Sequence, residues 1–260
     1  MVHREDPAGL IVISQPAHAW VSGQFARQWG NTRFGEFAPF EEVCLAAEQH
    51  DIGFLEWEKA PTFHAESGRP HQFRNMPTRP HLSLWCLGVL HLRAYSRYAA
   101  LLVSRHVTHL CQNNKLTRNP RDSQAIQDFL DQQFAIQSEL LSELRDDPEY
   151  REHTAPGVLE RNTRLLATWD WLSLVCCMGV DTPLTFKGVP MTAGTTPLEL
   201  LPDGNDRTVV GVRPWPFRTG HLAVQCDGRR LPGPFPDEAA MRTGLQQAPM
   251  VCVRMVLRPG

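Results

Sequence analysis

The sequence predicts a mainly α-helical protein with a small accessory β-sheet, and two observations lead to this fold class. Apolar residues recur at helical spacing through most of residues 15–180. Pro, Gly, Val and Arg dominate residues 183–260, where short apolar runs alternate with turn signals. We therefore expect a single domain over residues 1–260, in which a helical body (15–180) carries a β-rich C-terminal extension (183–260).

A short strand followed by a capped helix is expected at the amino end. Residues 10–14 are apolar and β-branched, so we expect a strand that joins the C-terminal sheet. Ser14 at the cap and Pro16 in the first turn then begin a helix, and Gly30 ends it. His18 lies on the apolar stripe of this helix and is expected to point into the core.

Five more segments have the spacing of amphipathic helices. They cover residues 39–51, 81–92, 95–109, 122–146 and 156–179. Residues 113–119 are a polar turn. Residues 54–80 lack periodicity and are rich in Pro, Gly, His and Arg, which is typical of a lid or a binding loop.

The C-terminal extension has three apolar runs that predict strands. They cover residues 208–212, 221–226 and 250–257. Asp203-Gly204 and Asp227-Gly228 are turn signals in this region. The sequence does not show whether the extension makes a dimer contact, so a homodimer is left open.

Charge and composition exclude several classes of protein. A net charge of -2 and a pI near 6.6 argue against a nucleic-acid partner, because proteins that bind polyanions usually carry a basic excess. No apolar run approaches the roughly 20 residues that a membrane span needs. The seven cysteines show no metal-site spacing and are expected to be reduced thiols. These features predict a cytoplasmic protein that acts on a small molecule.

Buried polar residues on the helical stripes suggest a metal site. Asp170 lies between Trp169 and Trp171 in a core helix, and a carboxylate buried there without a cation would cost several kcal/mol. Each of these residues, considered alone, has an ordinary structural explanation. Asp170 could pair with an arginine, and each histidine could be a hydrogen-bonded core residue. Coincidence is a poor explanation for five stripes together. The inward-facing candidates are His18, His50, Asp51, His81, His106 and Asp170.

The order of these residues resembles the HD superfamily of helical metalloproteins, named for its adjacent His-Asp pair. Ile52-Gly53 follows the pair, as in the HDIG form of the motif. Four segments also resemble the uncharacterised family DUF3891, and the resemblance spans most of the chain. They are Gln15-Pro16-Ala17-His18-Ala19, Ala47-Glu48-Gln49-His50-Asp51, the run from Tyr98 to His106, and Trp169-Asp170-Trp171-Leu172-Ser173-Leu174.

The HD resemblance implies a helical bundle around two divalent transition-metal ions, with His50 and Asp51 as catalytic residues. One ion would be held by His18, His50, Asp51 and Asp170. The second would be held by His81, His106 and a bridging Asp51. Imidazole and carboxylate ligands suit iron, our first expectation, and leave manganese, nickel, cobalt and zinc open.

Four polar residues are candidate substrate contacts: His109, Arg105, Glu56 and His64. Many HDIG-type sequences have a lysine after the glycine, which contacts an anionic substrate, whereas this chain has Phe54. The expected phosphate contact is therefore missing at that position, and the arginines are individually more typical of a solvated surface.

Three functions follow from these patterns. Most characterised HD proteins hydrolyse phosphate esters, so a phosphohydrolase acting on a small phosphate ester or nucleotide is our first expectation. A mixed-valent diiron oxygenase acting on a small organic molecule is the alternative, because both extra histidines are present and Phe54 replaces the lysine. The third is a non-catalytic helical protein that binds a ligand and uses the histidines as core polar residues.

Overall fold

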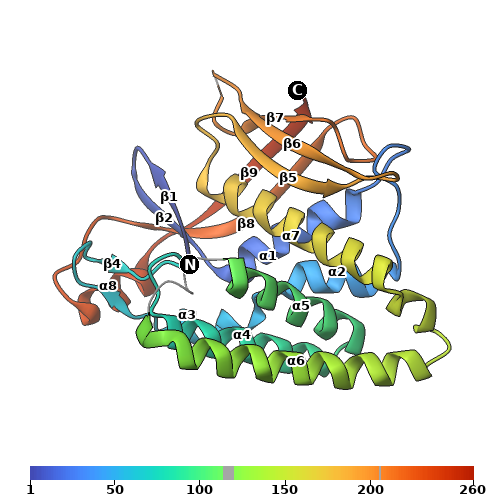
Figure 1. Ribbon diagram of the computed structural model, residues 1–260. Coiled ribbons are helices and arrows are strands. Elements are labelled where there is room, and N and C mark those ends of the chain that lie inside the picture. Colours follow the sequence, from blue (N-terminus) through green and yellow to red (C-terminus); the bar gives the residue numbers. More distant parts are fainter. Residues whose placement is uncertain (114–119, 205) are drawn as a thin grey trace.

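A curled seven-stranded sheet lies on one side of the molecule and helices fill the other (Figure 1). The computed structural model describes residues 1–113, 120–204 and 206–260. Its helices are α1 Gln15–Gln28, α2 Phe40–Gln49, α3 Leu55–Lys59, α4 Thr78–Arg93, α5 Arg97–Asn113, α6 Ser123–Asp146, α7 Pro156–Met178 and α8 Glu238–Gln247. Short 3-10 turns include η1 Ile52–Phe54, directly after the His-Asp pair.

The large sheet has the strand order β1-β2-β8-β9-β7-β6-β5. All neighbours are antiparallel except β7 and β9, which are parallel. Its strands are β1 Val2–Asp6, β2 Gly9–Ile13, β5 Leu184–Pro190, β6 Thr195–Pro202, β7 Val209–Arg213, β8 Leu222–Leu231 and β9 Met250–Pro259. A second sheet pairs β3 Phe63–His64 with β4 Arg69–Pro70.

The predicted fold class, a mainly α-helical protein with a small accessory sheet, is wrong. The sheet is large, and residues of helices and strands share one hydrophobic core. Strands β1, β5 and β6 were not predicted. Four of the five residues of β1 are charged or polar, and β5 and β6 include Pro, Gly or charged residues, which are depleted in strands. Helix α8 lies in a region where only strands were expected. The N-terminal strand does join the C-terminal strands, because β2 pairs with β8.

The predicted helices are present, with small shifts at their ends. Ser14 caps α1, and its side-chain oxygen accepts a hydrogen bond from the backbone N–H of Ala17 at 3.1 Å. The expected break between residues 92 and 95 separates α4 from α5. Residues 114–119 of the predicted polar turn lie outside the described residues.

The segment 54–80 is more regular than its composition indicated. It contains the end of η1, helix α3, the small β3-β4 sheet and the start of α4. Phe54 is fully buried, and its ring contacts His81 with a centroid separation of 5.5 Å. This part of the chain is therefore packed against the helical body and is not a free loop.

A glycine contact fixes η1 against α4. A Cβ atom added at Gly53 would lie 2.0 Å from the carbonyl oxygen of Leu84 and 2.6 Å from the backbone nitrogen of Gly88. Only glycine lets the two backbones approach this closely. The contact sets the position of the His-Asp pair relative to the helix that carries His81.

Among the described residues, no helix combines the length and apolar character of a membrane span.

Candidate metal centre

Four helices bring five of the predicted ligands together. His18 comes from α1, His50 and Asp51 follow the end of α2, His106 comes from α5 and Asp170 from α7. All five side chains are buried. Figure 1 shows why they can meet, because α1, α2, α5 and α7 lie side by side beneath the sheet.

The ligand atoms form two groups of three, each within 4.8 Å of one another, that share His50. In the first group, Asp51 Oδ2 lies 2.8 Å from His18 Nε2 and 3.7 Å from His50 Nε2. In the second, Asp170 Oδ1 lies 3.3 Å from His50 Nε2 and Asp170 Oδ2 lies 3.2 Å from His106 Nε2. Two carboxylates and three imidazoles therefore face one small volume.

Two of these histidines lack hydrogen-bond partners at the centre. His50 Nε2 and both ring nitrogens of His106 are buried and make no hydrogen bond to the part of the chain that the structure describes, although carboxylate oxygens lie nearby. Buried polar atoms normally find a partner. Nitrogen and oxygen atoms that converge without hydrogen-bond geometry are what a metal ion between them requires, so the donor set fits a divalent transition metal.

Hydrogen bonds outside the cluster orient two of the imidazoles. His50 Nδ1 donates to the carbonyl oxygen of Ala47 at 3.0 Å. Ser173 Oγ donates its proton to the carbonyl oxygen of Asp170 at 2.8 Å, so it accepts from His18 Nδ1 at 2.9 Å. Both Nδ1 atoms therefore carry protons, and both Nε2 atoms face the cluster. His18 Nε2 donates to Asp51 Oδ2 at 2.8 Å, and each Nε2 would bind a metal ion after losing any proton that it carries.

The electrostatics of the cluster also favour a cation. Burial disfavours a charge on His50, but the carboxylates of Asp51 and Asp170 outweigh it and raise the pKa of His50 to about 9. Burial likewise opposes ionisation of the two carboxyls, yet the neighbouring histidines hold the pKa of Asp51 below its usual range and that of Asp170 well below it. A proton on His50 thus offsets negative charge that a metal ion would otherwise neutralise.

His81 lies beside this cluster but outside both groups of three. It lines a cavity of about 80 Å³. The other residues of the lining are Gln15, His50, Asp51, Phe73, Trp85, Leu110, Asp170 and Leu174. Burial lowers the pKa of His81 to about 4, against the opposing charge of Asp51, and its Nδ1 has no hydrogen-bond partner. A neutral imidazole therefore faces the same cavity as the carboxylates.

Comparison with known protein families identifies the family of this chain. The family described as "Protein of unknown function (DUF3891)" matches residues 1–233. The chain belongs to the DUF3891 family. No curated protein and no solved structure matches the chain. The family match includes every candidate ligand and carries no activity, so the function of this DUF3891 member must be inferred from the site itself.

The four predicted substrate contacts lie away from the cavity lining in this DUF3891 chain. Arg105 donates to Thr163 Oγ1 at 3.1 Å. His109 is exposed on α5 beside Asn113. Glu56 forms an exposed ion pair with Lys59, and His64 bonds Ser67 Oγ near the small sheet. The structure does not bring them to the metal ligands, and their role as substrate contacts stays a prediction.

Three polar residues around the centre were not assigned this role from the sequence. Gln15 Nε2 donates to Asp51 Oδ2 at 2.9 Å, and Ser173 orients His18. Glu58 is buried, and its carboxylate accepts a hydrogen bond from the backbone nitrogen of Gln15. The position of Gln15 three residues before His18, on the same helical face, is the one sequence signal for its role.

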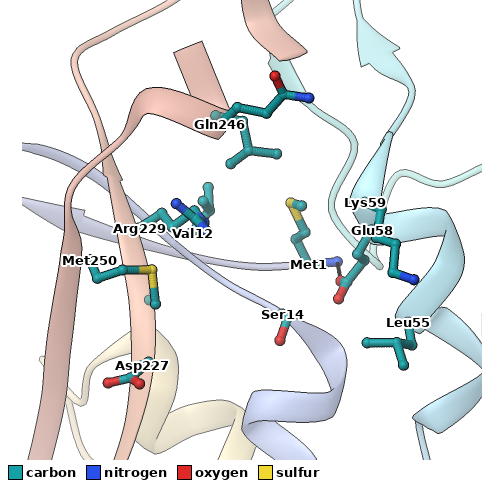
Figure 2. A pocket seen from close by; sticks show the side chains of 12 residues that line it. Met1, Val12, Ser14, Leu55, Glu58, Lys59, Asp227, Arg229, Gln246 and Met250 are labelled. Carbon is teal, nitrogen blue, oxygen red and sulfur yellow. Dashed lines mark ion pairs between the residues drawn. The ribbon is translucent and has the colours of Figure 1, made fainter. Parts of the chain in front are cut away.

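A larger cavity, of about 280 Å³, lies on the other side of the first residues of α1. Figure 2 shows Glu58 in its wall, paired with the amine of Met1, with Ser14 below them. Ser14 and Glu58 line this cavity, whereas the next residue, Gln15, lines the smaller one. The start of α1 therefore separates the two cavities.

Proposed function

We propose that this DUF3891 chain is a metal-dependent hydrolase of the HD type that binds two divalent transition-metal ions and acts on a small phosphate ester or nucleotide. The observation that carries the proposal is the buried cluster in which the Nε2 atoms of His50 and His106 lack hydrogen-bond partners while lying 3.2–3.3 Å from the Asp170 carboxylate. Buried, oriented imidazoles beside carboxylates support metal binding more than a structural role.

The first ion would be held by His18, His50, Asp51 and Asp170. His50 has one free lone pair, because its Nδ1 proton is donated to Ala47. The two groups of three that share His50 therefore cannot each bind a separate ion through it. This supports a single ion bound through His50.

The second ion would be held by His81, His106 and a bridging Asp51. The free Nδ1 of His81 and the two free nitrogens of His106 support this assignment. The nitrogen and oxygen donors favour iron among the candidates and also suit manganese, nickel, cobalt and zinc.

When bound, the ions would acidify a water molecule and offset the charge that builds on a phosphoryl oxygen. The water oxygen would form a bond to phosphorus, the ester P–O bond would break, and the leaving oxygen would take a proton, so no oxidant or reductant is needed. The side chains of Asp51 and His50 would orient the reacting groups at the metal centre. The buried walls of the small cavity would limit the access of other water molecules.

Oxygen chemistry at a diiron centre is the second candidate, and the cavity walls favour it. Phe73, Trp85, Leu110 and Leu174 line the cavity, and within the described part of the chain no Lys or Arg does so. Phe54, where many HDIG-type sequences have lysine, packs on His81. An apolar lining suits a small organic substrate better than a phosphate.

Metal-loaded protein distinguishes these candidates. We would load purified protein separately with Mn²⁺, Fe²⁺, Co²⁺, Ni²⁺ and Zn²⁺ and measure hydrolysis of p-nitrophenyl phosphate and bis(p-nitrophenyl) phosphate. Turnover that disappears in Asp51→Ala and persists in His91→Ala, a variant of a histidine on α4 outside the cavity lining, supports hydrolysis. A coupled diiron EPR signal after partial oxidation, without ester turnover under any metal, supports the oxygenase instead.

A further inference from the structure

Gln15 is the one amide side chain among the described residues that line the small cavity. It is the first residue of α1 and only 3% exposed. It faces the same space as His50, Asp51 and Asp170. A buried amide beside ionised groups is expected to have a specific set of hydrogen-bond partners.

The backbone of Gln15 is fixed by a buried carboxylate. Its N–H lies 3.0 and 2.9 Å from the two carboxylate oxygens of Glu58. Glu58 is itself held by an ion pair of 2.8 Å with the amine of Met1, which Figure 2 shows as a dashed line. The start of α1 therefore has little freedom to move relative to the cavity.

The orientation of the Gln15 amide follows from its partner. Nε2 lies 2.9 Å from Asp51 Oδ2, and an ionised carboxylate only accepts hydrogen bonds, so the NH₂ end must face Asp51. The other end, Oε1, is buried and has no hydrogen-bond partner among the described residues. An unpaired buried carbonyl oxygen is unfavourable, so a donor is expected in the adjoining space.

Water is the donor that fits this space. The cavity of about 80 Å³ exceeds the ~10–15 Å³ that one water molecule needs, and it offers several polar partners. A water that donates to Gln15 Oε1 would lie among the side chains proposed to bind metal. Its position is that of the attacking water in the proposed reaction.

We propose that Gln15 is a positioning residue for hydrolysis, whose Oε1 accepts a hydrogen bond from the attacking water while its Nε2 fixes the orientation of Asp51. This inference rests on the proposed function. The hydrogen bond aligns a lone pair of the water with the phosphorus atom. The bond that forms is O–P, the bond that breaks is the ester P–O, and Gln15 is unchanged.

The test compares wild type with Gln15→Met, which preserves volume, and Gln15→Glu, which preserves shape but cannot donate to Asp51. Gln137→Met is the control, because Gln137 is a buried glutamine in α6 bonded to Ser104 and Thr108. Each protein is saturated with Co²⁺, and its visible absorption is followed from pH 5 to 10 to monitor deprotonation of the water. The kcat and KM for p-nitrophenyl phosphate are measured alongside.

We expect both Gln15 variants to raise the midpoint of the absorption change by about one pH unit and to lower kcat roughly 10–100-fold with little change in KM. The control should match wild type. If either folded, cobalt-loaded Gln15 variant has the wild-type midpoint and kcat, or if wild type shows no absorption change with pH, the inference is overturned. If wild type hydrolyses no ester yet the midpoint shifts, the proposed function fails and the role of Gln15 in water binding stands.

Discussion

At the scale of residues, the centre depends on which nitrogen of each histidine is free. The Nδ1 protons of His18 and His50 are donated to Ser173 and to the carbonyl of Ala47, away from the cluster. Each Nε2 therefore faces the carboxylates and is the ring nitrogen through which the histidine would bind a metal ion. The ligands thus have an outer set of partners, and removal of one such partner should weaken metal binding without removal of a ligand.

Ser173→Ala tests this arrangement. Loss of the hydroxyl frees the ring of His18, so we expect metal affinity to fall roughly 10–100-fold, measured by competition with a chelating dye. Ser22→Ala is the matched control. Ser22 lies on α1 and is buried like Ser173, but its hydroxyl has no hydrogen-bond partner among the described residues. Equal affinities of wild type and Ser173→Ala would show that the His18 contact does not orient a ligand.

The pH dependence of stability can be tested at His3, away from the proposed ligands. Burial, with the charges of Met1 and Arg69, lowers the pKa of His3 from 6.5 to about 4. Between these values the unfolded chain binds a proton that the folded chain does not, so the free energy of unfolding falls as pH falls.

His3→Gln removes that titration. From pH 7 to pH 5, wild type should lose on the order of 1 kcal/mol more stability than the variant, after allowance for the partial exposure of the ring. Urea denaturation at both pH values measures the difference. Parallel losses in the two proteins would contradict a depressed pKa at His3.

Which site residues were predictable depends on their chemistry. His18, His50, Asp51, His106 and Asp170 stand out because charged or titratable groups are unusual on apolar helical stripes. Gln15 and Ser173 give no such signal, because amides and hydroxyls are common in cores and acquire a role only through neighbours distant in sequence.

At the scale of elements, the approach of η1 to α4 determines how the His-Asp pair faces His81. Gly53→Ala places a methyl group against the backbone atoms of Leu84 and Gly88, and a shift of these backbone atoms would cost free energy. We expect destabilisation of roughly 1–3 kcal/mol, measured by urea denaturation. Gly157→Ala in α7, where a Cβ meets nothing within 4 Å, should be neutral or stabilising by up to ~1 kcal/mol. A Gly53→Ala variant with the same free energy of unfolding as wild type would contradict the close approach of η1 to α4.

The elements that the sequence predicted correctly are those with a strong period. Helices α6 and α7 have long apolar stripes, and Ser14 signals the start of α1 through its capping chemistry. Strand β1 was missed because its sequence is mostly polar and it pairs at the sheet edge with β2. The size of the sheet depends on pairings such as β7 with β9, which connect residues far apart in the chain.

At the scale of the whole molecule, the proposed ligands join helices from distant parts of the sequence. The two proposed ions would together link α1, α2, α4, α5 and α7, and would bind only the folded chain. Metal removal leaves the Asp51 and Asp170 carboxylates without that charge. A metal present at 100 times its Kd stabilises the folded state by about 2.7 kcal/mol.

Chelator treatment should accordingly lower the melting temperature, and added metal should restore it. Differential scanning calorimetry with and without EDTA measures the change. Asp51→Ala, which removes a proposed ligand of both ions, serves as the control that should not respond. Identical melting curves for wild type with saturating metal and with chelator would argue against a metal that stabilises the fold.

The central claim is that the buried cluster binds metal, and metal content per chain tests it most directly. Elemental analysis of anaerobically purified protein, before and after loading with Fe²⁺, should give at least one ion per wild-type chain. His50→Ala should lose this metal, whereas His91→Ala should retain it. A wild-type protein that binds no metal on loading, or a folded His50→Ala variant with full metal content, would contradict the account.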